Sequence, residues 1–521
     1  MKTGAKPVSA GRKLVSGSVL RVVSLAVSAI CSFFLMPFVV HHLGDRLYGF
    51  WSLASVFIGY YSLLDLGLSS AVSQYVCVAI GRNDVGECRA VFNTALRIQA
   101  LLGGAALVAT FAIAAATPLF TRVAADAHLF RSVILILGAN TALSFPIKVY
   151  NGVLDAQYRF DINASLTILG VVLRTGLVIV AILAGGQLLA LAWMTLLASL
   201  PMAALQIWFG KREAHWARIE IKFETNNRVK SLFSYSIYSF LSYLADILRF
   251  QVDPLVISGL IGLAAVTHYR VAAIFTQQYF LQILVLSVGI LGPVLSRHHG
   301  AGDRAQIEEV FLFGTKLSCC ISAFICFALI GWGKPFIARW MGPKYLDAYW
   351  PLVILALSVL VDVCQRSSID LLYATFNHRF YTYLNWAEGI LNLAFSLALA
   401  RPLGIIGVAL GTLIAALLIR IIVQPWWVCK VSKLHYLNYM RFWGGTLLQC
   451  IFWTGIAIAV SAWGLRPSYP LLISSAILAS ILYAGGSWLF VLNPSERTKL
   501  LAAMSNRRQE KIETPEPVAA L

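Results

Sequence analysis

Charged residues are scarce in this chain. Lys, Arg, Asp and Glu make up only 12% of its 521 residues, whereas hydrophobic residues make up 59%. A soluble domain carries about 25% charged residues, so this content is too low to cover a water-exposed surface of this size. The composition therefore excludes an ordinary soluble protein and indicates that a lipid bilayer is the main solvent.

Several motifs and segments are also missing. The sequence has no Gly-x-x-x-x-Gly-Lys-Ser/Thr loop, which excludes ATP hydrolysis by that route. Its nine cysteines and nine histidines lack metal-site spacing, so we expect no metal centre and interpret the cysteines as packing residues. No stretch between apolar runs exceeds about 25 residues, which leaves no room for an extramembrane catalytic domain. We therefore expect that the protein is not an enzyme. In particular, we do not expect a membrane-bound polysaccharide polymerase or ligase, which would need larger loops for its catalytic groups.

Long apolar runs are what the sequence has in abundance. A helix needs ~20 apolar residues to cross the hydrocarbon core. About fourteen runs qualify, at 14–40, 48–80, 91–116, 132–149, 164–184, 188–209, 234–257, 266–294, 310–332, 351–374, 383–400, 404–428, 442–463 and 470–492. Continuous runs indicate helices, because the strands of a membrane barrel alternate apolar and polar residues. The sequence predicts an all-α polytopic membrane protein with an uncleaved first helix.

The basic residues indicate how the chain crosses the membrane. Lys and Arg number 41 against 23 Asp and Glu, a net charge of +18. If the N-terminus is inside, 25 basic residues fall in inner segments and only eight in outer ones. Basic residues favour the cytoplasmic side, so we expect both termini in the cytoplasm. Most of the excess positive charge thus reflects topology.

A weak internal repeat divides the chain. The shift that places Gly81–Asp84 on Gly300–Asp303 also places Val91-Phe92 on Val310-Phe311 and Arg97 on Lys316. A shift one position longer places Arg159-Phe160 on Arg379-Phe380. Six spans per repeat keep the same orientation, which predicts two pseudo-symmetric lobes related by an axis along the membrane normal. The predicted domains are a six-helix lobe (1–209), a cytoplasmic linker (210–233), a second six-helix lobe (234–428), two extra helices (429–492) and a cytoplasmic tail (493–521).

Three motifs near the N-terminus suggest a family. They are Leu43-Gly-Asp-Arg-Leu-Tyr-Gly-Phe50, Leu64-Asp-Leu-Gly-Leu-Ser-Ser-Ala71 and Gly81-Arg-Asn-Asp84. Their order and spacing resemble the O-antigen-type polysaccharide flippases of the multidrug/oligosaccharidyl-lipid/polysaccharide (MOP) exporter superfamily. The resemblance implies translocation of an undecaprenyl-pyrophosphate-linked oligosaccharide across the bacterial inner membrane, by alternating access, for surface polysaccharide biosynthesis.

The same resemblance sets the expected partners. They are the lipid-linked oligosaccharide, membrane lipids, and a polysaccharide polymerase or chain-length machinery, with no nucleic acid. No cofactor is expected, although coupling to an H⁺ or Na⁺ gradient is open. The alternative function is a MATE-type cation-coupled multidrug antiporter. That reading needs an acidic cavity, whereas the predicted spans hold eight basic and six acidic residues.

Charged side chains inside the spans are the candidate site. Each costs several kcal/mol unless it is paired or hydrated, and guanidinium groups suit phosphate oxygens. The candidates for substrate binding are Arg21, Arg270, Arg249, Arg366, Arg97 and Lys316. Arg21 and Arg270 lead, because relatives turn the helices at these positions toward the central cavity. Asp65 is either a structural anchor at a helix bend or a carboxylate that binds the coupling ion.

Structural alternatives compete with most of these roles. Asp362, Arg366 and Asp370 are spaced to stack along one helix face and neutralise one another. The same holds for Asp246, Arg249 and Asp253. Arg97 and Lys316 are close enough to the inner ends of their helices to reach lipid headgroups, or to form a ring at the cytoplasmic mouth. Arg174 and Arg420 have no acidic residue within four positions, so their counter-charge must come from another helix, water or a ligand.

Overall fold

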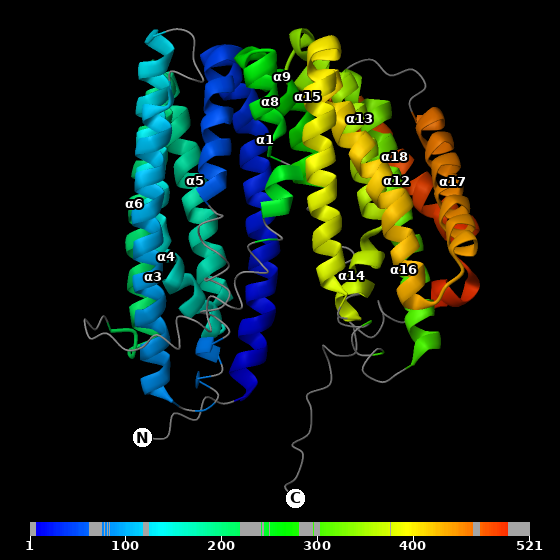
Figure 1. The fold of residues 1–521 in the computed structure, drawn as a ribbon, viewed down its shortest axis with the longest axis horizontal. Coiled ribbons are helices and arrows are strands. Elements are labelled where there is room, and N and C mark those ends of the chain that lie inside the picture. Colours follow the sequence, from blue (N-terminus) through cyan, green and yellow to red (C-terminus); the bar gives the residue numbers. More distant parts are fainter. Residues whose placement is uncertain are drawn as a thin grey trace, which may run out of the picture. The chain divides into compact units, whose positions relative to one another are not determined.

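The computed structural model is helical throughout the part of the chain that it describes (Figure 1). That part comprises residues 7–61, 75–77, 79–80, 82, 84–117, 124–218, 241, 244–249, 251–280, 295, 298, 303–375, 377–461 and 469–498. No strand occurs among these residues. The predicted all-α class is therefore confirmed.

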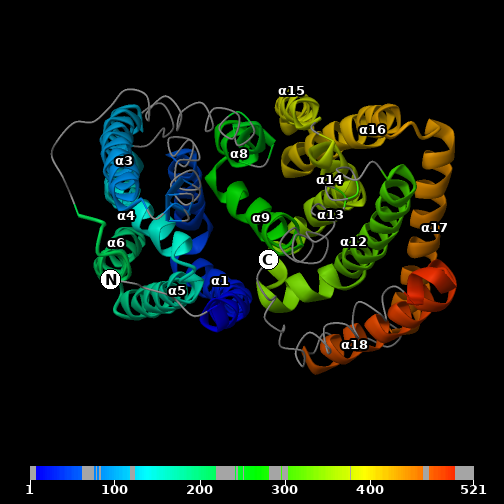
Figure 2. The same cartoon turned by 90° about the horizontal axis from the view of Figure 1, so that it is seen from below.

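The chain separates into two compact units. The N-terminal unit comprises Met1–Arg270 and Ala400–Val408. Its helices are α1 (Pro7–Tyr60), α3 (Val85–Ala115), α4 (Ala124–Ala156), α5 (Phe160–Leu183), α6 (Leu188–Glu213), α8 (Asp253–Leu260) and most of α9 (Leu263–Ala273). Within it, α5 packs between α1 and α6, and α4 packs against α6, α3 and α1. These contacts arrange α1, α5, α6 and α4 in a ring (Figure 2).

The C-terminal unit comprises Val271–Leu399 and Ala409–Leu521. Its elements are η3 (Ile274–Phe280), α12 (Arg304–Trp340), η4 (Pro343–Ala348), α13 (Tyr349–Cys364), α14 (Arg366–Ala374), most of α15 (His378–Ala416), η5 (Leu417–Val423), α16 (Gln424–Ser432), α17 (Tyr436–Ser461), α18 (Tyr469–Gly486) and η6 (Ser487–Val491). Helix α12 is central, because α13, α14, α17 and α18 all pack against it. Five of the free cysteines lie in the apolar core around it, at 319, 320, 326, 364 and 450, which confirms their packing role.

Nine helical stretches of the described chain are long and apolar enough to cross a membrane. The two longest, Leu20–Tyr60 with 41 residues and Arg379–Ser432 with 54, have enough residues for two crossings each. Each contains a glycine with a left-handed backbone, Gly44 with φ 80° and Gly404 with φ 60°. Gly44 lies between the predicted spans 14–40 and 48–80, and Gly404 is the first residue of the predicted span 404–428, so each stretch is long enough for two spans. The predicted spans 234–257 and 266–294 lie partly outside the described residues, and the count of fourteen stays a prediction.

Glycine positions repeat along the chain. Gly185, between α5 and α6, has φ 83°, and Gly404 has φ 60°. Residues other than glycine rarely adopt this conformation, so a shared glycine marks an equivalent sharp turn. The shift that places Gly185 on Gly404 is the one that places Gly81 on Gly300, and this agreement supports the internal repeat, while the two pseudo-symmetric lobes stay a prediction. The exact domain boundaries at 209, 233, 428 and 492 stay predictions.

Candidate functional site

The six predicted cations divide between the two units. Arg21, Arg97, Arg249 and Arg270 belong to the N-terminal unit, and Lys316 and Arg366 belong to the C-terminal unit. Asp65 lies outside the described residues. Arg97 is half-buried and Arg249 is buried, and both make polar contacts. The self-neutralising group of Asp246, Arg249 and Asp253 stays a prediction.

Arg21 is exposed on α1. It interacts electrostatically with Asp155 of α4. The same carboxylate accepts a hydrogen bond of 2.8 Å from the Asn163 amide of α5. Arg21 therefore faces a polar region where three helices of the ring meet.

Arg270 is half-buried in the last turn of α9, and that helix is tied to the break in α1. The Thr267 hydroxyl donates to the Asp45 backbone oxygen at 2.7 Å. A Cβ on Gly49 would collide with the Leu263 backbone oxygen, so only glycine permits this approach. Asp45 and Gly49 belong to the motif at 43–50. Its role in holding α9 was missed from sequence, because its partners are remote from it along the chain.

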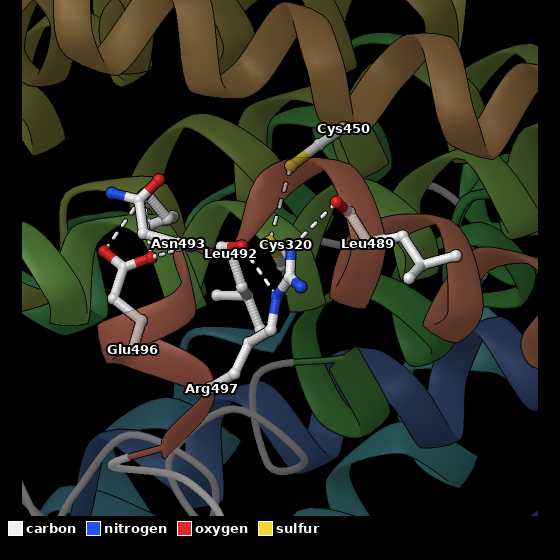
Figure 3. A network of polar contacts seen from close by, with 8 residues as sticks. Cys320, Cys450, Leu489, Leu492, Asn493, Glu496 and Arg497 are labelled. Carbon is white, nitrogen blue, oxygen red and sulfur yellow. Dashed lines mark hydrogen bonds and ion pairs between the residues drawn. The ribbon is translucent and has the colours of Figure 1, made fainter.

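Lys316 is buried in α12, where both oxygens of Glu496 accept from its ammonium group at 3.0 and 2.9 Å. The expectation that it reaches the lipid headgroups is therefore wrong. Figure 3 shows the network around this carboxylate, in which Glu496 also accepts from the Asn493 N–H at 2.7 Å. Arg497 donates to the backbone oxygens of Leu492 and Leu489 at 3.0 and 2.8 Å. These contacts fix the segment that follows η6.

Arg420 contacts four polar side chains of the C-terminal unit. It is fully buried in η5, and its guanidinium lies 3.2 Å from Asp362 Oδ1 and 2.7 Å from Glu388 Oε2. It also donates to the side-chain oxygens of Gln424 and Asn385, each at 2.7 Å. The counter-charge of Arg420 thus comes from other helices. The sequence had left another helix, water or a ligand as its possible source.

These contacts correct the predicted stack of Asp362, Arg366 and Asp370. The helix is interrupted at Gln365, where α13 ends and α14 begins. Arg366 pairs with Asp370 at 3.6 Å as expected, but Asp362 forms an ion pair with Arg420 instead. The prediction that these three residues neutralise one another is therefore correct for Arg366 and Asp370 and wrong for Asp362.

A polar pocket lies among α4, α5 and α6 of the N-terminal unit. Its volume is about 400 Å³. The described residues that line it are Asn140, Asn151, Leu166, Thr167, Gly170, Val171, Arg174, Thr195, Ala198, Ser199, Met202 and Gln206. None of these is acidic, and Arg174 is the one charged side chain among them. Arg174 was noted from sequence as a charge without a neighbouring counter-charge, but the pocket around it depends on three helices and was not foreseen.

Solved structures share this fold at low sequence identity. The lipid II flippase MurJ in an inward closed conformation aligns with a TM-score of 0.65 at 13% identity, over 91% of this chain and 98% of its own. An inward-facing multidrug resistance MATE transporter of the MOP superfamily aligns with a TM-score of 0.63 at 17% identity, over 79% of this chain and 99% of its own. These likenesses establish the fold.

The sequence comparisons identify the family. The uncharacterised membrane protein EpsK of Bacillus subtilis (strain 168) is 24% identical over 490 residues, which cover 91% of this chain and 95% of EpsK. Residues 43–350 match a family described as polysaccharide biosynthesis protein. That match begins at the first of the three motifs and covers more than half of the chain. The protein therefore belongs to the polysaccharide biosynthesis protein family, and it has the fold that the lipid II flippase and the MATE transporter share.

Proposed function

We propose that this protein moves an undecaprenyl-pyrophosphate-linked oligosaccharide across the bacterial inner membrane, for surface polysaccharide biosynthesis. Family membership supports polysaccharide biosynthesis, and the fold is one that a lipid II flippase also has. The two units would alternate access to the two sides of the membrane, with both chain termini in the cytoplasm. In this proposal the chain itself is not an enzyme.

The balance of unpaired charge supports an anionic cargo. The buried carboxylates of the described chain are engaged by donors, since Tyr269 donates to Asp253 and Arg420 contacts Glu388. Asp370 lies beside Arg366. Among the described residues of the pocket, by contrast, the Arg174 guanidinium contacts no carboxylate. An excess of unpaired positive charge favours an anionic cargo and disfavours the acidic cavity that a MATE-type multidrug antiporter would need.

Arg21 and Arg270 remain the proposed contacts to the pyrophosphate. Arg21 is exposed and, among the described residues, interacts electrostatically with Asp155 and donates no hydrogen bond from its side chain, so its donors are available to a ligand. Arg270 is held in place by the contacts of α9 with the break in α1. Arg97 and Arg249 stay predicted contacts. A substrate would have to displace existing carboxylates to reach Lys316 or Arg366, so these two are weaker proposals.

The decisive experiment is deletion of the gene in its host. We expect lipid-linked oligosaccharide to accumulate on the inner leaflet, and the native gene to restore its normal distribution. The variants Arg21→Ala and Arg270→Ala should reach the membrane in normal amounts but fail to complement. Arg131→Ala, an exposed arginine on α4 outside the pocket, is the matched control and should complement fully.

Three other outcomes would count against the proposal or a part of it. An unchanged leaflet distribution after deletion would overturn the flippase assignment, and increased drug sensitivity in the same strain would favour the antiporter. Full complementation by both arginine variants would overturn the site assignment alone. Coupling to an H⁺ or Na⁺ gradient, with Asp65 as the carboxylate, and association with a polymerase or chain-length machinery are secondary parts of the proposal.

A further inference from the structure

The pocket around Arg174 has a chemistry that the fold alone does not require. Helix α5 contains 24 residues, and Arg174 is the fifteenth. At 1.5 Å per residue the guanidinium-bearing residue lies roughly 21 Å from one end of the helix and roughly 14 Å from the other. Both distances place its Cα within the ~30 Å hydrocarbon core of a bilayer. A cation at this depth is costly unless water or an anion faces it.

The surface pattern of α5 shows which way Arg174 points. Leu169, Val172 and Val180 are large apolar residues with exposed side chains, and they follow one stripe of the helix. Thr167 and Arg174 are spaced i, i+7, on the opposite side of the helix from that stripe, and both are exposed where they line the pocket. Arg174 therefore points into the ring of the N-terminal unit, away from the lipid, and is accessible there.

The guanidinium has no partner there. In the part of the chain that the structure describes, Arg174 makes no ion pair and no hydrogen bond, and the Cys31 thiol of α1 interacts with it electrostatically. A structural arginine in the membrane is normally paired, as Arg420 is in the C-terminal unit. Arg174 has instead kept all five N–H donors available, a planar fork that matches a carboxylate or a phosphoryl group.

The remaining polar groups suit hydroxyls. The lining carries the amides of Asn140, Asn151 and Gln206 and the hydroxyls of three Ser and Thr residues. The Asn151 Oδ1 atom is buried and accepts no hydrogen bond in the described structure. A buried acceptor without a donor destabilises the protein, and a ligand hydroxyl that donates to it would remove this cost. A volume of about 400 Å³ lies in the range of small-molecule sites.

From these observations we propose that the pocket among α4, α5 and α6 binds a sugar that carries one oxyanion, either a carboxylate or a phosphoryl group. The anion lies on the Arg174 fork, and a sugar hydroxyl donates to Asn151 Oδ1. The site is an anionic-sugar site inside the N-terminal unit. The inference rests on the proposed function for the source of the sugar, which would be the head of the transported lipid, but the site itself does not depend on transport.

The test is calorimetric titration of the full-length protein in lipid nanodiscs with four probes: glucuronate, glucose 1-phosphate, glucose and inorganic phosphate. We expect one of the two anionic sugars to bind at least about tenfold more tightly than glucose, since a charge-assisted bidentate contact is roughly twice as strong as a neutral one. Whichever anionic sugar binds better identifies the oxyanion as carboxylate or phosphoryl. Inorganic phosphate should bind more weakly than that sugar, because it leaves Asn151 unsatisfied.

Variants locate the binding. Arg174→Gln should weaken the binding of the anionic sugar by at least about tenfold, and Arg174→Lys should fall between, because lysine keeps the charge and loses the fork. Asn151→Leu should remove the preference for the sugar over phosphate. Arg131→Gln, an exposed arginine of α4 outside the lining, is the matched control and should bind as the native protein does.

Several results would overturn the inference. They are no binding of either anionic sugar to the native protein, equal affinity in Arg174→Gln, or phosphate binding as tightly as the sugars. The outcome is separable from that of the proposed function. If the protein flips lipid-linked oligosaccharide but binds neither anionic sugar, only this inference is overturned. If it binds an anionic sugar but its deletion leaves the leaflet distribution unchanged, only the proposed function is overturned.

Discussion

Asp84 and Asp303 make the same helix cap in two places, one in each unit of the chain. Their backbones nearly coincide, with φ and ψ of −93° and 89° at Asp84 and −83° and 87° at Asp303. Each carboxylate accepts from the backbone N–H three residues later, at 2.8 and 3.2 Å. Each backbone N–H donates to the carbonyl five residues earlier, at 3.0 and 3.1 Å. The repeat thus extends to individual hydrogen bonds.

The two caps should contribute alike to stability. Asp84→Ala and Asp303→Ala each remove an acceptor from the first turn of a long helix, and we expect each to cost about 1 kcal/mol. The sites are in different units, so the double variant should lose the sum. Thermal unfolding of the purified protein, followed with a dye that reacts with its buried cysteines, measures this. Asp→Asn at either site keeps the acceptor and should cost much less, and equal losses for Asn and Ala would contradict the capping role.

Adjacent glycines in α3 should respond in opposite ways. A Cβ on Gly103 would lie 2.8 Å from the Ala142 backbone oxygen of α4, whereas a Cβ on Gly104 would meet nothing within 4 Å. Gly103→Ala should therefore force α3 and α4 apart, at a cost of about 1–3 kcal/mol. Gly104→Ala should be neutral or stabilise the helix by up to about 1 kcal/mol. The same unfolding assay compares them, and similar effects of the two substitutions would rule out this close packing of α3 on α4.

Removal of Arg420 should damage the C-terminal unit severely. Arg420→Met leaves Asp362 and Glu388 buried beside an apolar side chain, and we expect a loss of about 3–5 kcal/mol. The measurement is the amount of folded protein in the membrane together with its unfolding temperature. Adding Asp362→Asn and Glu388→Gln to this variant should restore much of the loss, because the uncompensated charges disappear. Arg401→Met, an exposed arginine, serves as control, and a stable Arg420→Met single variant would refute the argument.

The contact between Lys316 and Glu496 should couple the two side chains energetically. Glu496→Ala leaves a buried ammonium group without its carboxylate, and Lys316→Met leaves the carboxylate without its cation. In a double-mutant cycle, the double variant should lose about 1–3 kcal/mol less free energy of unfolding than the two single variants lose together. Glu308→Ala changes an exposed carboxylate on the same helix α12 and should show no coupling to Lys316→Met. Additive losses at Lys316 and Glu496 would mean that the contact contributes nothing.

The helix breaks show what the sequence could predict. The break at Gly44 lies between two predicted spans and the break at Gly404 lies at the start of one, because glycine and the drop in apolar content mark both places locally. The interruption at Gln365 has no glycine or proline nearby, and a continuous span over 351–374 was expected there. Both oxygens of Gln365 accept from remote residues, since the Gln424 amide donates to its backbone oxygen at 3.2 Å and the Tyr439 hydroxyl donates to its side-chain oxygen at 3.2 Å. Such a break depends on tertiary partners.

In the candidate site, too, local features could be predicted from the sequence and tertiary contacts could not. The residue types and their depth in the membrane were readable from sequence, and so was the lack of a local counter-charge at Arg174 and Arg420. Which of these two arginines is paired was not, because Asp362 and Glu388 reach Arg420 from other helices. Spacing along one helix predicted a partner for Arg366 correctly and one for Asp362 wrongly.

The ion pair between Asp362 and Arg420 also constrains how the protein is made. Both carboxylates that contact Arg420, those of Asp362 and Glu388, leave the ribosome before the arginine does. A carboxylate near the middle of a membrane-spanning stretch, as Asp362 is within Pro343–Ala374, costs about 2.5–3.5 kcal/mol to insert. Helix α13 therefore carries the unpaired charge of Asp362 until Arg420 has been synthesised. We expect this helix to be held at the insertion machinery until η5 arrives, so that the C-terminal unit enters the lipid as a group of helices.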